Sequence, residues 1–376
     1  MWLSNAPVIQ APWPAAEYYN VWPEKIKRME IKNSPVVTVL TTVYNGMPFL
    51  KEAVRSILEQ TYQDFEYIII NDGSTDGSVQ FLKNIKDPRV KVYSNPKNYG
   101  TGYSSKKGVE IAIGKYIAIL DADDISMPHR LEKQVDFLEK NSNIGILCGN
   151  CCLIDEQGRE KGIMKSSATD LDSRWRLLFY SPFIHSTVMM RRIVLVNHQL
   201  NYNDKITAAV DYNLLSQVIR FSEASNLGEI VGKYRVNPMG ETQTKRSQQL
   251  KSSYKTSLHT IQQYISDYHV EEDQHNRLVR WLKGESFNAD NIYLSRLYLY
   301  LLNIFIGYHN NSPGLKLFKQ KETLRVARYI IRDRQVQQIG STLPRLIKIN
   351  PQIIFFFLSS ILLSIWNRFK KKLVLT

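Results

Sequence analysis

The sequence predicts an α/β fold in which helices cover both faces of a mostly parallel sheet. Apolar, β-branched runs recur at residues 36–42, 67–70, 90–93 and 116–120, and such runs are typical of buried parallel strands. Segments with helical spacing of apolar residues separate these runs. Two of the runs end in acidic loops, and open α/β sheets bind their ligands at the carboxyl ends of strands.

The elements alternate regularly in the first part of the chain and become helical in the last part. The expected order is strand 36–42, helix 48–60, strand 67–70, a helix ending near residue 85, strand 90–93, helix 101–113, strand 116–120 and helix 127–141. Further strand-like runs occupy 144–150, 186–190 and 232–236, with a helix near 212–221. From about residue 241 the spacing of apolar residues is helical throughout,.

These patterns divide the chain into four parts. Residues 1–34 form an arm rich in Pro and Trp, which either docks by its aromatic side chains or is a partly disordered tail,. Residues 35–240 form the α/β domain, and residues 241–345 a helical region. Residues 346–376 form a basic, apolar C-terminal segment. The total length of 376 residues suits one large domain with an extension, or two domains,.

The composition is that of a folded globular protein, with 43% hydrophobic and 22% charged residues,. The cysteines Cys148, Cys151 and Cys152 have no second Cys or His pair nearby to complete a zinc site, so we expect buried, reduced thiols,. The N-terminus lacks the basic start and apolar core of a signal peptide,. We therefore expect a cytoplasmic protein.

The C-terminal segment predicts contact with a membrane surface. About +11 of the formal net charge of +14 lies between Lys316 and Thr376,. The apolar run 353–366 would span about 21 Å as a helix, short of the roughly 30 Å hydrocarbon core. A basic patch attracts nucleic acid and anionic lipid alike, but this apolar run favours lipid, and we expect no nucleic-acid partner. A helix packed on its own domain is the alternative.

The first acidic loop, residues 71–77, reads Asn-Asp-Gly-Ser-Thr-Asp-Gly. A carboxylate such as Asp72 in a glycine-rich turn beyond a strand can accept hydrogen bonds from a nucleobase or a ribose hydroxyl. Gly73 would let the backbone approach a flat base closely. The alternative is a simple turn or helix cap, for which Ser74 and Asp76 are better placed than Asp72.

The second acidic loop contains Asp121, Asp123 and Asp124. In an extended segment Asp121 and Asp123 would share a face, and their charges would repel unless a cation neutralised them. Oxygen ligands favour Mn²⁺ or Mg²⁺ over zinc, and substrate phosphates would complete the shell. An acidic, solvated turn without a metal is the alternative.

Taken together, these motifs resemble the family 2 glycosyltransferases of the GT-A fold. The resemblance covers about residues 35–240, and the joint spacing of the motifs is specific although each motif alone is not. The segments that carry it are 36–45, 71–77, 114–124, 128–134, 185–192 and 234–238. It implies a GT-A nucleotide-diphospho-sugar transferase fold with a C-terminal helical extension.

The resemblance implies a donor site at the two acidic loops. Thr42, Tyr44 and Asp72 would hold uracil, or another base, and its ribose. Asp121 would lie against the ribose and the water shell of the metal, and Asp123 would bind the metal directly. A UDP-sugar is the expected donor, with Mn²⁺ or Mg²⁺ as the cofactor that neutralises the leaving diphosphate.

Further roles are implied by residues outside the acidic loops. The family inverts the anomeric centre, and Asp211 matches the carboxylate that takes the proton of the acceptor hydroxyl. Arg235, in the run 234–238, matches a donor-binding position. His185 either acts on the acceptor side, where it could position the base, or is a structural histidine.

The chain departs from the family pattern at two positions. The Glu that usually precedes the base is Val210, so any support that it gave the base or acceptor is absent. Lys106 stands where the family usually has a polar pair that includes Arg. Lys106 either contacts the donor diphosphate as a point charge, or the change alters donor preference or activity.

These observations predict an inverting, metal-dependent glycosyltransferase of the hexosyltransferase type. The expected acceptor is a saccharide or polyprenyl-linked saccharide, used in the assembly of a bacterial surface or extracellular polysaccharide. The expected location is peripheral, on the anionic inner face of the cell membrane. The alternative is a non-catalytic relative that binds a glycan or a partner. A dehydrogenase is disfavoured because no G-x-G-x-x-G follows the first strand,.

Overall fold

The computed structural model describes residues 34–238, 240–265, 268–285, 287 and 290–332. The chain forms two compact units that divide between Tyr268 and His269. The expected arm at 1–34, apart from Ser34, and the C-terminal segment 346–376 lie outside the described residues. None of the described helices has the length and apolarity needed to cross a membrane.

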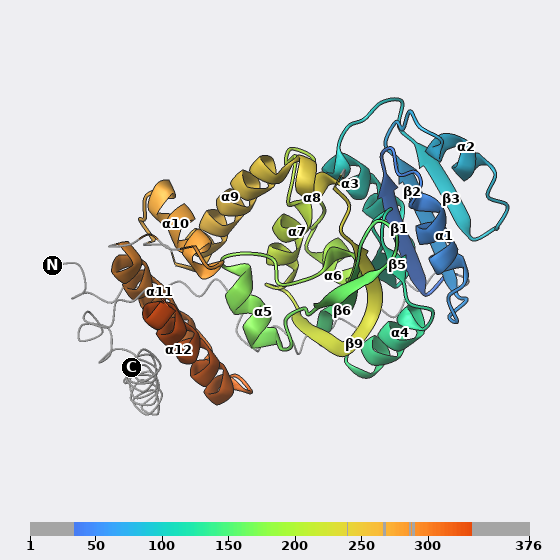
Figure 1. The fold of residues 1–376 in the computed structure, drawn as a ribbon. Helices are drawn as coiled ribbons and strands as arrows, with labels where there is room; N and C mark the ends of the chain where they lie inside the picture. The colour runs from blue at the N-terminus through green and yellow to red at the C-terminus, as the bar shows by residue number, and fades with distance from the viewer. Residues whose placement is uncertain (1–33, 239, 266–267, 286, 288–289, 333–376) are drawn as a thin grey trace, which may run out of the picture. The chain divides into compact units, whose positions relative to one another are not determined.

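The first unit is built on one mixed sheet (Figure 1). Its strands lie in the order β3-β2-β1-β4-β8-β6-β9-β5, and β7 pairs with β6. The strands are β1 (Val37–Val43), β2 (Phe65–Asn71), β3 (Val90–Ser94), β4 (Tyr116–Ile119), β5 (Ile125–Ser126), β6 (Ile144–Ile154), β7 (Glu160–Met164), β8 (Met189–Arg191) and β9 (Glu223–Arg235).

The expected mostly parallel sheet is confirmed. β1 pairs in parallel with both β2 and β4, and β3 pairs in parallel with β2. β6 and β9 are also parallel to each other. The short strands β5, β7 and β8 are the ones that run antiparallel to their neighbours. This β1-centred arrangement brings the carboxyl ends of β1, β2 and β4 together at one edge of the sheet.

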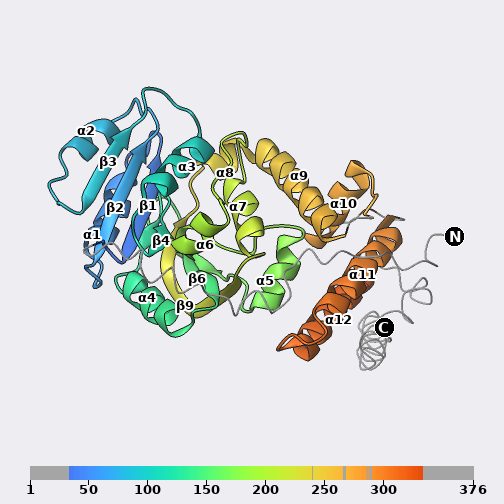
Figure 2. The same ribbon diagram turned by 180° about the vertical axis from the view of Figure 1, so that it is seen from behind.

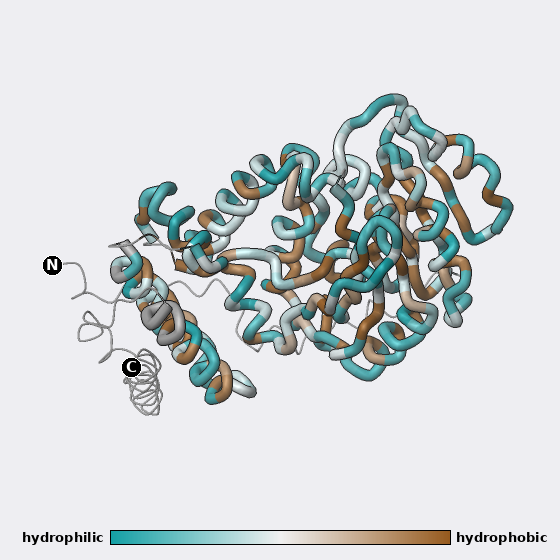
Figure 3. Tube along the Cα trace, in the orientation of Figure 1, coloured by the Kyte–Doolittle hydropathy of each residue, from teal (hydrophilic) through white to brown (hydrophobic). Residues whose placement is uncertain are grey.

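Helices cover both faces of the sheet, as the sequence predicts. The helices of the first unit are α1 (Leu50–Leu58), α2 (Ser78–Lys83), α3 (Thr101–Ile111), α4 (Arg130–Lys140), α5 (Asp170–Leu177), α6 (Arg192–Asn197), α7 (Val210–Val218), α8 (Glu241–Thr244) and α9 (Arg246–Tyr264). One core cluster joins α1, α2 and α4 to the sheet, and a second joins α3, α5, α6 and α7 (Figures 1 and 2). The hydrophobic stretches of the chain follow the central strands in Figure 3.

Alternating side chains of the strands supply the two cores. In β2, Tyr67 and Ile69 belong to the core with α1, whereas Ile68 and Ile70 belong to the core with α3. All four side chains are at most 1% exposed. The period of two along a strand therefore explains why the sequence shows a continuous apolar run there.

Two predicted strands differ from the structure. The expected strand at 186–190 is wrong in its first half, because His185–Thr187 forms a 3-10 turn, η3, closed by the Thr187 N–H on the Ile184 carbonyl. β9 begins at Glu223, well before the predicted run at 232–236. Its first residues are polar, but they pair with β6 from Ile144 onward, and this long-range pairing has no local hydrophobic signal,.

The predicted buried, reduced cysteines are confirmed. Cys148, Cys151 and Cys152 are buried in β6 and form no disulfide. Burial raises the pKa of Cys148 to about 12. These thiols therefore serve as small core side chains.

The second unit is helical. It contains α10 (Glu272–Leu282), α11 (Asp290–Tyr308) and α12 (Leu315–Arg332). Trp281 of α10 meets Tyr298 of α11 edge-on, with ring centroids 6.2 Å apart. Phe305 of α11 lies 5.4 Å from Phe318 of α12, measured between ring centroids. These aromatic contacts hold the three helices together.

Candidate active site

Three loops lie side by side at one edge of the sheet. β1 lies between β2 and β4, with Val43 opposite Asn71 and Leu40 opposite Ile119. The loops that leave these strands therefore start close together, and they carry Tyr44, the first acidic loop and the second acidic loop. The structure thus brings the two acidic loops to the edge where the sequence predicts a ligand site.

Asp72 holds the segment that follows β3. Its Oδ1 accepts hydrogen bonds from Asn95 Nδ2 at 2.8 Å and from the Tyr99 N–H at 3.0 Å, and its Oδ2 accepts one from the Gly100 N–H at 2.8 Å. Lys107 Nζ lies 3.0 Å from Asn95 Oδ1 and so joins the same network. Asp72 is buried, and its hydrogen bonds hold residues 95–100 in place as a wall beside the predicted base site. Direct contact of Asp72 with a base stays a prediction.

Gly73 makes this wall possible. Its φ is +70°, and a Cβ at this position would lie 2.4 Å from the Lys97 carbonyl carbon. In this structure the close approach that Gly73 permits is therefore to the backbone of the segment after β3. A side chain here would push that segment away.

The first acidic loop is also tied to the loop after β1. Ser74 Oγ accepts from the Asn45 N–H at 2.9 Å, and Asp76 Oδ2 accepts from the Met47 N–H at 3.0 Å. Asp76 Oδ1 accepts from the Ser78 N–H at the start of α2. Tyr44 is left 49% exposed, so its ring is available to a planar ligand,.

The second acidic loop is a turn. The Asp124 N–H donates to the Asp121 carbonyl at 3.2 Å, so the extended geometry expected for residues 121–124 is wrong. The turn sends its three carboxylates to different partners. Asp123 Oδ2 accepts from Asn237 Nδ2 at 3.1 Å, while Asp121 Oδ1 lies 3.1 Å from His185 Nδ1.

Asp124 is the structural acid of this turn. It is buried, and its Oδ1 accepts from the Arg235 N–H at 2.8 Å while its Oδ2 accepts from Ser186 Oγ. Burial, together with the charges of Asp123 and Asp121, raises the pKa of Asp124 well above its usual value. Asp124 therefore holds the turn between η3 and β9.

Arg235 holds the turn from the other side. Its Nε donates to the Asp123 carbonyl at 2.9 Å, and one terminal nitrogen forms an ion pair with Glu52 of α1 at 2.5 Å. The other terminal nitrogen donates to the carbonyls of Asp155 and Glu156. The side chain is buried by these contacts. The structure therefore places Arg235 beside the acidic loop, and its predicted contact with the donor stays a prediction.

His185 connects the acidic loop to the loop before α7. Its Nδ1 faces Asp121, and its Nε2 lies 2.9 Å from the Tyr202 hydroxyl. Burial disfavours the charged form of His185, but Tyr202, Asp121 and Asp211 outweigh it and raise the pKa of His185 well above its usual value. Burial likewise opposes ionisation of Asp121, but His185 and Ser186 lower the pKa of this carboxyl.

Asp211 lies in the first turn of α7 and is partly exposed. The residue before the helix, Ala209, has a φ of +54°, which sets the direction in which α7 leaves the loop. The Asp211 charge contributes to the raised pKa of both His185 and Tyr202. The Tyr202 hydroxyl contacts His185, so the loop that leads into α7 connects the predicted base to the predicted acceptor-side histidine.

The two departures from the family pattern have different surroundings. Val210 is buried in the second core cluster, where a Cβ added at Gly102 would lie 3.2 Å from Val210 Cγ1. Lys106 Nζ forms an exposed ion pair with Asp204 at 2.8 Å. Lys107 is the one of the two lysines that reaches the Asp72 network. The diphosphate contact suggested for Lys106 stays a prediction.

The carboxylates of the turn fit a hard divalent cation that also binds other oxygen ligands. Burial and the charge of Asp121 raise the pKa of Asp123. A bound cation would relieve the repulsion between these two carboxylates. Within the described residues, no three acidic, His or Cys side chains gather closely enough to hold a metal alone. Asp121 and Asp123 would therefore need ligands from a substrate.

The sequence pattern assigns no role to several residues of this site. Ser186, Tyr202 and Asn237 each contact the acidic turn or His185, yet a hydroxyl or amide in a loop is common. Lys107 directly follows Lys106 in α3, and the two side chains differ only in the direction in which they leave the helix,. The run 234–238 is the one sequence feature that points toward Asn237.

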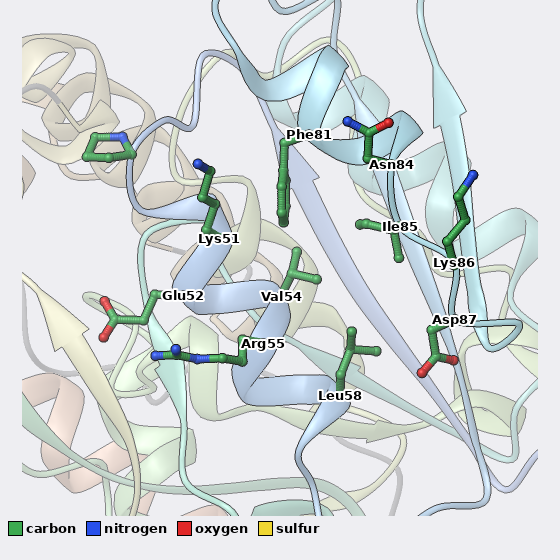
Figure 4. Close-up of a pocket in the computed structure, with 11 residues that line it drawn as sticks. Lys51, Glu52, Val54, Arg55, Leu58, Phe81, Asn84, Ile85, Lys86 and Asp87 are labelled. Atoms are coloured by element: carbon green, nitrogen blue, oxygen red, sulfur yellow. The ribbon is translucent and has the colours of Figure 1, made fainter.

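A separate cavity of about 540 Å³ lies between α1 and α2 (Figure 4). Its floor is apolar, with Val54, Leu58 and Phe81 facing one another, and Lys51 and Glu52 lie along α1 at its rim. None of the acidic-loop residues lines it. Glu52 is its link to the site, through the ion pair with Arg235.

Comparisons with known proteins agree with this arrangement. Residues 38–195 match the family model for glycosyl transferase family 2. An uncharacterised glycosyltransferase of Haemophilus influenzae is 31% identical over 328 residues, which cover 80% of this chain and 98% of the relative. An uncharacterised glycosyltransferase of Methanocaldococcus jannaschii is 30% identical over 73% of this chain and 89% of the relative.

Solved structures show the same fold. Residues 1–349 of S. aureus TarS, solved in complex with UDP-GlcNAc, superpose with a TM-score of 0.53 at 17% identity. The match covers 84% of this chain and 91% of the TarS chain. The expected GT-A fold is thereby confirmed, and with it the C-terminal helices. On the family model and the sequence match to its relatives, this chain belongs to family 2 of the glycosyltransferases.

Proposed function

We propose that this glycosyltransferase transfers a sugar from a nucleotide-diphospho-sugar to an acceptor hydroxyl, with inversion at the anomeric carbon, and that Asp211 is its catalytic base. One observation carries the proposal: His185 contacts Asp121 of the acidic turn on one side and, on the other, Tyr202 of the loop that leads into α7, where Asp211 lies. A donor held at the acidic turn and an acceptor held at α7 would then meet in one place.

The proposed reaction is a direct displacement at the anomeric carbon. The acceptor hydroxyl oxygen attacks the anomeric carbon from the face opposite the diphosphate, and its proton passes to the Asp211 carboxylate. The bond from the anomeric carbon to the phosphate oxygen breaks, and its electron pair leaves with the nucleotide. A single carboxylate suffices because the sugar never becomes attached to the protein.

Donor binding is proposed for the loops at the ends of β1, β2 and β4. The exposed Tyr44 ring and Thr42 would hold the base, beside the wall that Asp72 fixes. Asp121 and Asp123 would hold Mn²⁺ or Mg²⁺, which when bound neutralises charge on the departing diphosphate. A UDP-sugar is the favoured donor, since the structural neighbour TarS was solved with UDP-GlcNAc.

The acceptor is proposed to be a saccharide or a lipid-linked saccharide at the inner face of the cell membrane, in polysaccharide assembly. Support comes from the basic, apolar sequence of residues 346–376,. Removing these residues should release the protein from membranes in fractionation. Equal partition of the full and the shortened chain would contradict the membrane proposal and leave the transfer reaction untouched.

The first experiment is a thermal-shift panel of UDP-, GDP-, CDP- and dTDP-sugars, each with Mn²⁺ and with EDTA. A ligand at about 100 times its dissociation constant stabilises the protein by roughly 2.7 kcal/mol, which is a visible shift. A shift that needs Mn²⁺ and is confined to one nucleotide supports the proposal. No shift with any donor would favour a non-catalytic binding protein.

A further inference from the structure

Tyr202 is a buried tyrosine whose hydroxyl reaches into the site. Its side chain is 2% exposed, and its ring belongs to the second core cluster. The hydroxyl lies 2.9 Å from His185 Nε2, on the ring edge opposite the nitrogen that faces Asp121. Tyr202, His185 and Asp121 therefore form a continuous chain of contacts that ends at the acidic turn.

We propose that Tyr202 is a positioning residue, which fixes the His185 ring and through it the Asp121 carboxylate relative to Asp211. The proposal rests on the proposed function, because it assigns Tyr202 to the same donor and acceptor site. In this proposal Tyr202 acts through His185 and makes no contact of its own with the reacting atoms.

Hydrogen bonds at both ring nitrogens determine the orientation of a histidine. The torsion that turns the ring is broad when the ring is free, so contacts rather than rotamer preference must hold it. A hydroxyl can both donate and accept, and Tyr202 therefore satisfies Nε2 whichever protonation state His185 adopts. Such outer contacts commonly change metal affinity or activity by about 10- to 100-fold when they are removed.

The Tyr202 backbone is itself anchored. Its N–H donates to Asn201 Oδ1 at 2.8 Å, and Asn201 Nδ2 donates to the Lys106 carbonyl of α3 at 3.2 Å. The Lys106–Asp204 ion pair closes the same contact from the other side. The loop before α7 is therefore held on α3, and the Tyr202 hydroxyl is presented from a fixed support.

The close packing at α3 supports this view. A Cβ added at Gly102 would lie 2.8 Å from the Asn203 carbonyl oxygen, so the helix needs glycine there for the loop to approach. Lys106 thus acquires a second explanation. In this explanation, its charge secures the loop that carries Tyr202 through the pair with Asp204.

Tyr212 provides a matched control. It is also 2% exposed and lies in the same core cluster, but its hydroxyl donates to the Leu177 carbonyl at 2.9 Å. Tyr202→Phe and Tyr212→Phe each remove one buried hydroxyl and leave the ring in place. A purely structural role would make the two variants behave alike.

The test uses the full chain in three forms: wild type, Tyr202→Phe and Tyr212→Phe. Calorimetry measures the affinity for UDP, GDP, CDP or dTDP in the presence of Mn²⁺, and transfer assays with the active donor measure kcat and KM. We expect similar small losses of thermal stability in both variants. Only Tyr202→Phe should weaken Mn²⁺-dependent nucleotide binding and lower kcat, each by about tenfold or more.

A double-mutant cycle with His185→Gln shows whether Tyr202 acts through the histidine. If it does, adding Tyr202→Phe to His185→Gln should have little further effect on nucleotide affinity or kcat. Additive effects would contradict the proposal, as would equal behaviour of Tyr202→Phe and Tyr212→Phe. If the wild type binds no nucleotide with Mn²⁺, the proposed function fails and this proposal fails with it.

Discussion

Arg235 and Glu52 form an ion pair at 2.5 Å between a side chain that is 2% exposed and one that is 42% exposed. Arg235 also donates to the Asp123 carbonyl, so α1 is connected to the acidic turn through one guanidinium. The pair is therefore a support of the site, and it extends to the rim of the cavity between α1 and α2.

Removal of Glu52 should loosen the acidic turn. Glu52→Ala removes the ion-pair partner of the buried Arg235. We expect the free energy of unfolding to fall by about 1–2 kcal/mol, less than for a fully buried pair because Glu52 is 42% exposed,. Mn²⁺-dependent nucleotide affinity should fall as well. The control is Glu59→Ala, whose 4.0 Å pair with Arg55 is exposed, and denaturant titration should detect almost no change there.

The two adjacent acids of the turn should behave differently. Asp123→Ala should abolish Mn²⁺-dependent nucleotide binding with little change in melting temperature, because Asp123 is a proposed metal ligand. Asp124→Ala should lower the melting temperature by several degrees, because Ser186 and the Arg235 N–H lose their acceptor,. Thermal shifts without ligand and calorimetry with Mn²⁺ separate the two effects. If Asp124→Ala abolished Mn²⁺-dependent nucleotide binding and Asp123→Ala only lowered the melting temperature, Asp124 would be the metal ligand.

Asp211→Asn should remove transfer while sparing donor binding. The amide keeps the size of the side chain but cannot take the acceptor proton, so we expect kcat to fall by at least about 100-fold. The dissociation constant of the donor nucleotide should change by less than about threefold. Asp136→Asn, an acid of α4 whose pair with Lys140 is exposed, is the control. Substantial activity in Asp211→Asn would reject this residue as the base.

Gly73→Ala should cost more stability than an ordinary glycine replacement. At Gly73 the positive φ costs about 1–2 kcal/mol for alanine, and the new Cβ also meets the Lys97 backbone at 2.4 Å,. Gly158 has a similar φ of +79°, but a Cβ there meets nothing within 4 Å. Urea unfolding should therefore give a clearly larger loss for Gly73→Ala than for Gly158→Ala. Equal losses would show that the backbone around Lys97 moves aside without any loss of stability.

The second unit should lose stability in mild acid through His275. Burial lowers the pKa of this histidine to about 4, so between about pH 6.5 and 4 the unfolded chain binds a proton that the folded chain does not. Its contribution is intact above pH 6.5 and falls as the pH is lowered, by about 1 kcal/mol between pH 7.5 and 5.5. Unfolding of wild type and His275→Phe at both pH values should show a smaller acid loss in the variant. An equal loss would mean that His275 titrates normally in the folded chain.

Local sequence accounts for the elements around the first acidic loop. The run at 67–70 is buried on both sides, so its hydrophobic signal is continuous, and the loop that follows carries turn residues,. The same reasoning places the strand that ends near Asp121. These predictions held because each depended on neighbours in the chain.

Elsewhere, long-range contacts determine the local structure, and the local sequence pattern does not predict it. The first residues of β9 are polar, and only the partner strand β6 makes them a strand. The turn at 121–124 is closed by Asp124, which Ser186 and Arg235 hold from distant parts of the chain. A local rule that assumes an extended segment has no access to such partners.

The sequence by itself determined the alternation of strands and helices, the two acidic loops at strand ends and the resemblance that names Asp211. The tertiary structure alone decided which polar groups meet: that Asp124 is internal, that Arg235 pairs with Glu52, and that Tyr202 reaches His185. The physical reason is the distance along the chain over which each kind of interaction acts. Hydrophobic periodicity and turn chemistry act over a few residues, whereas hydrogen-bond partners are set by how the whole sheet brings its loops together.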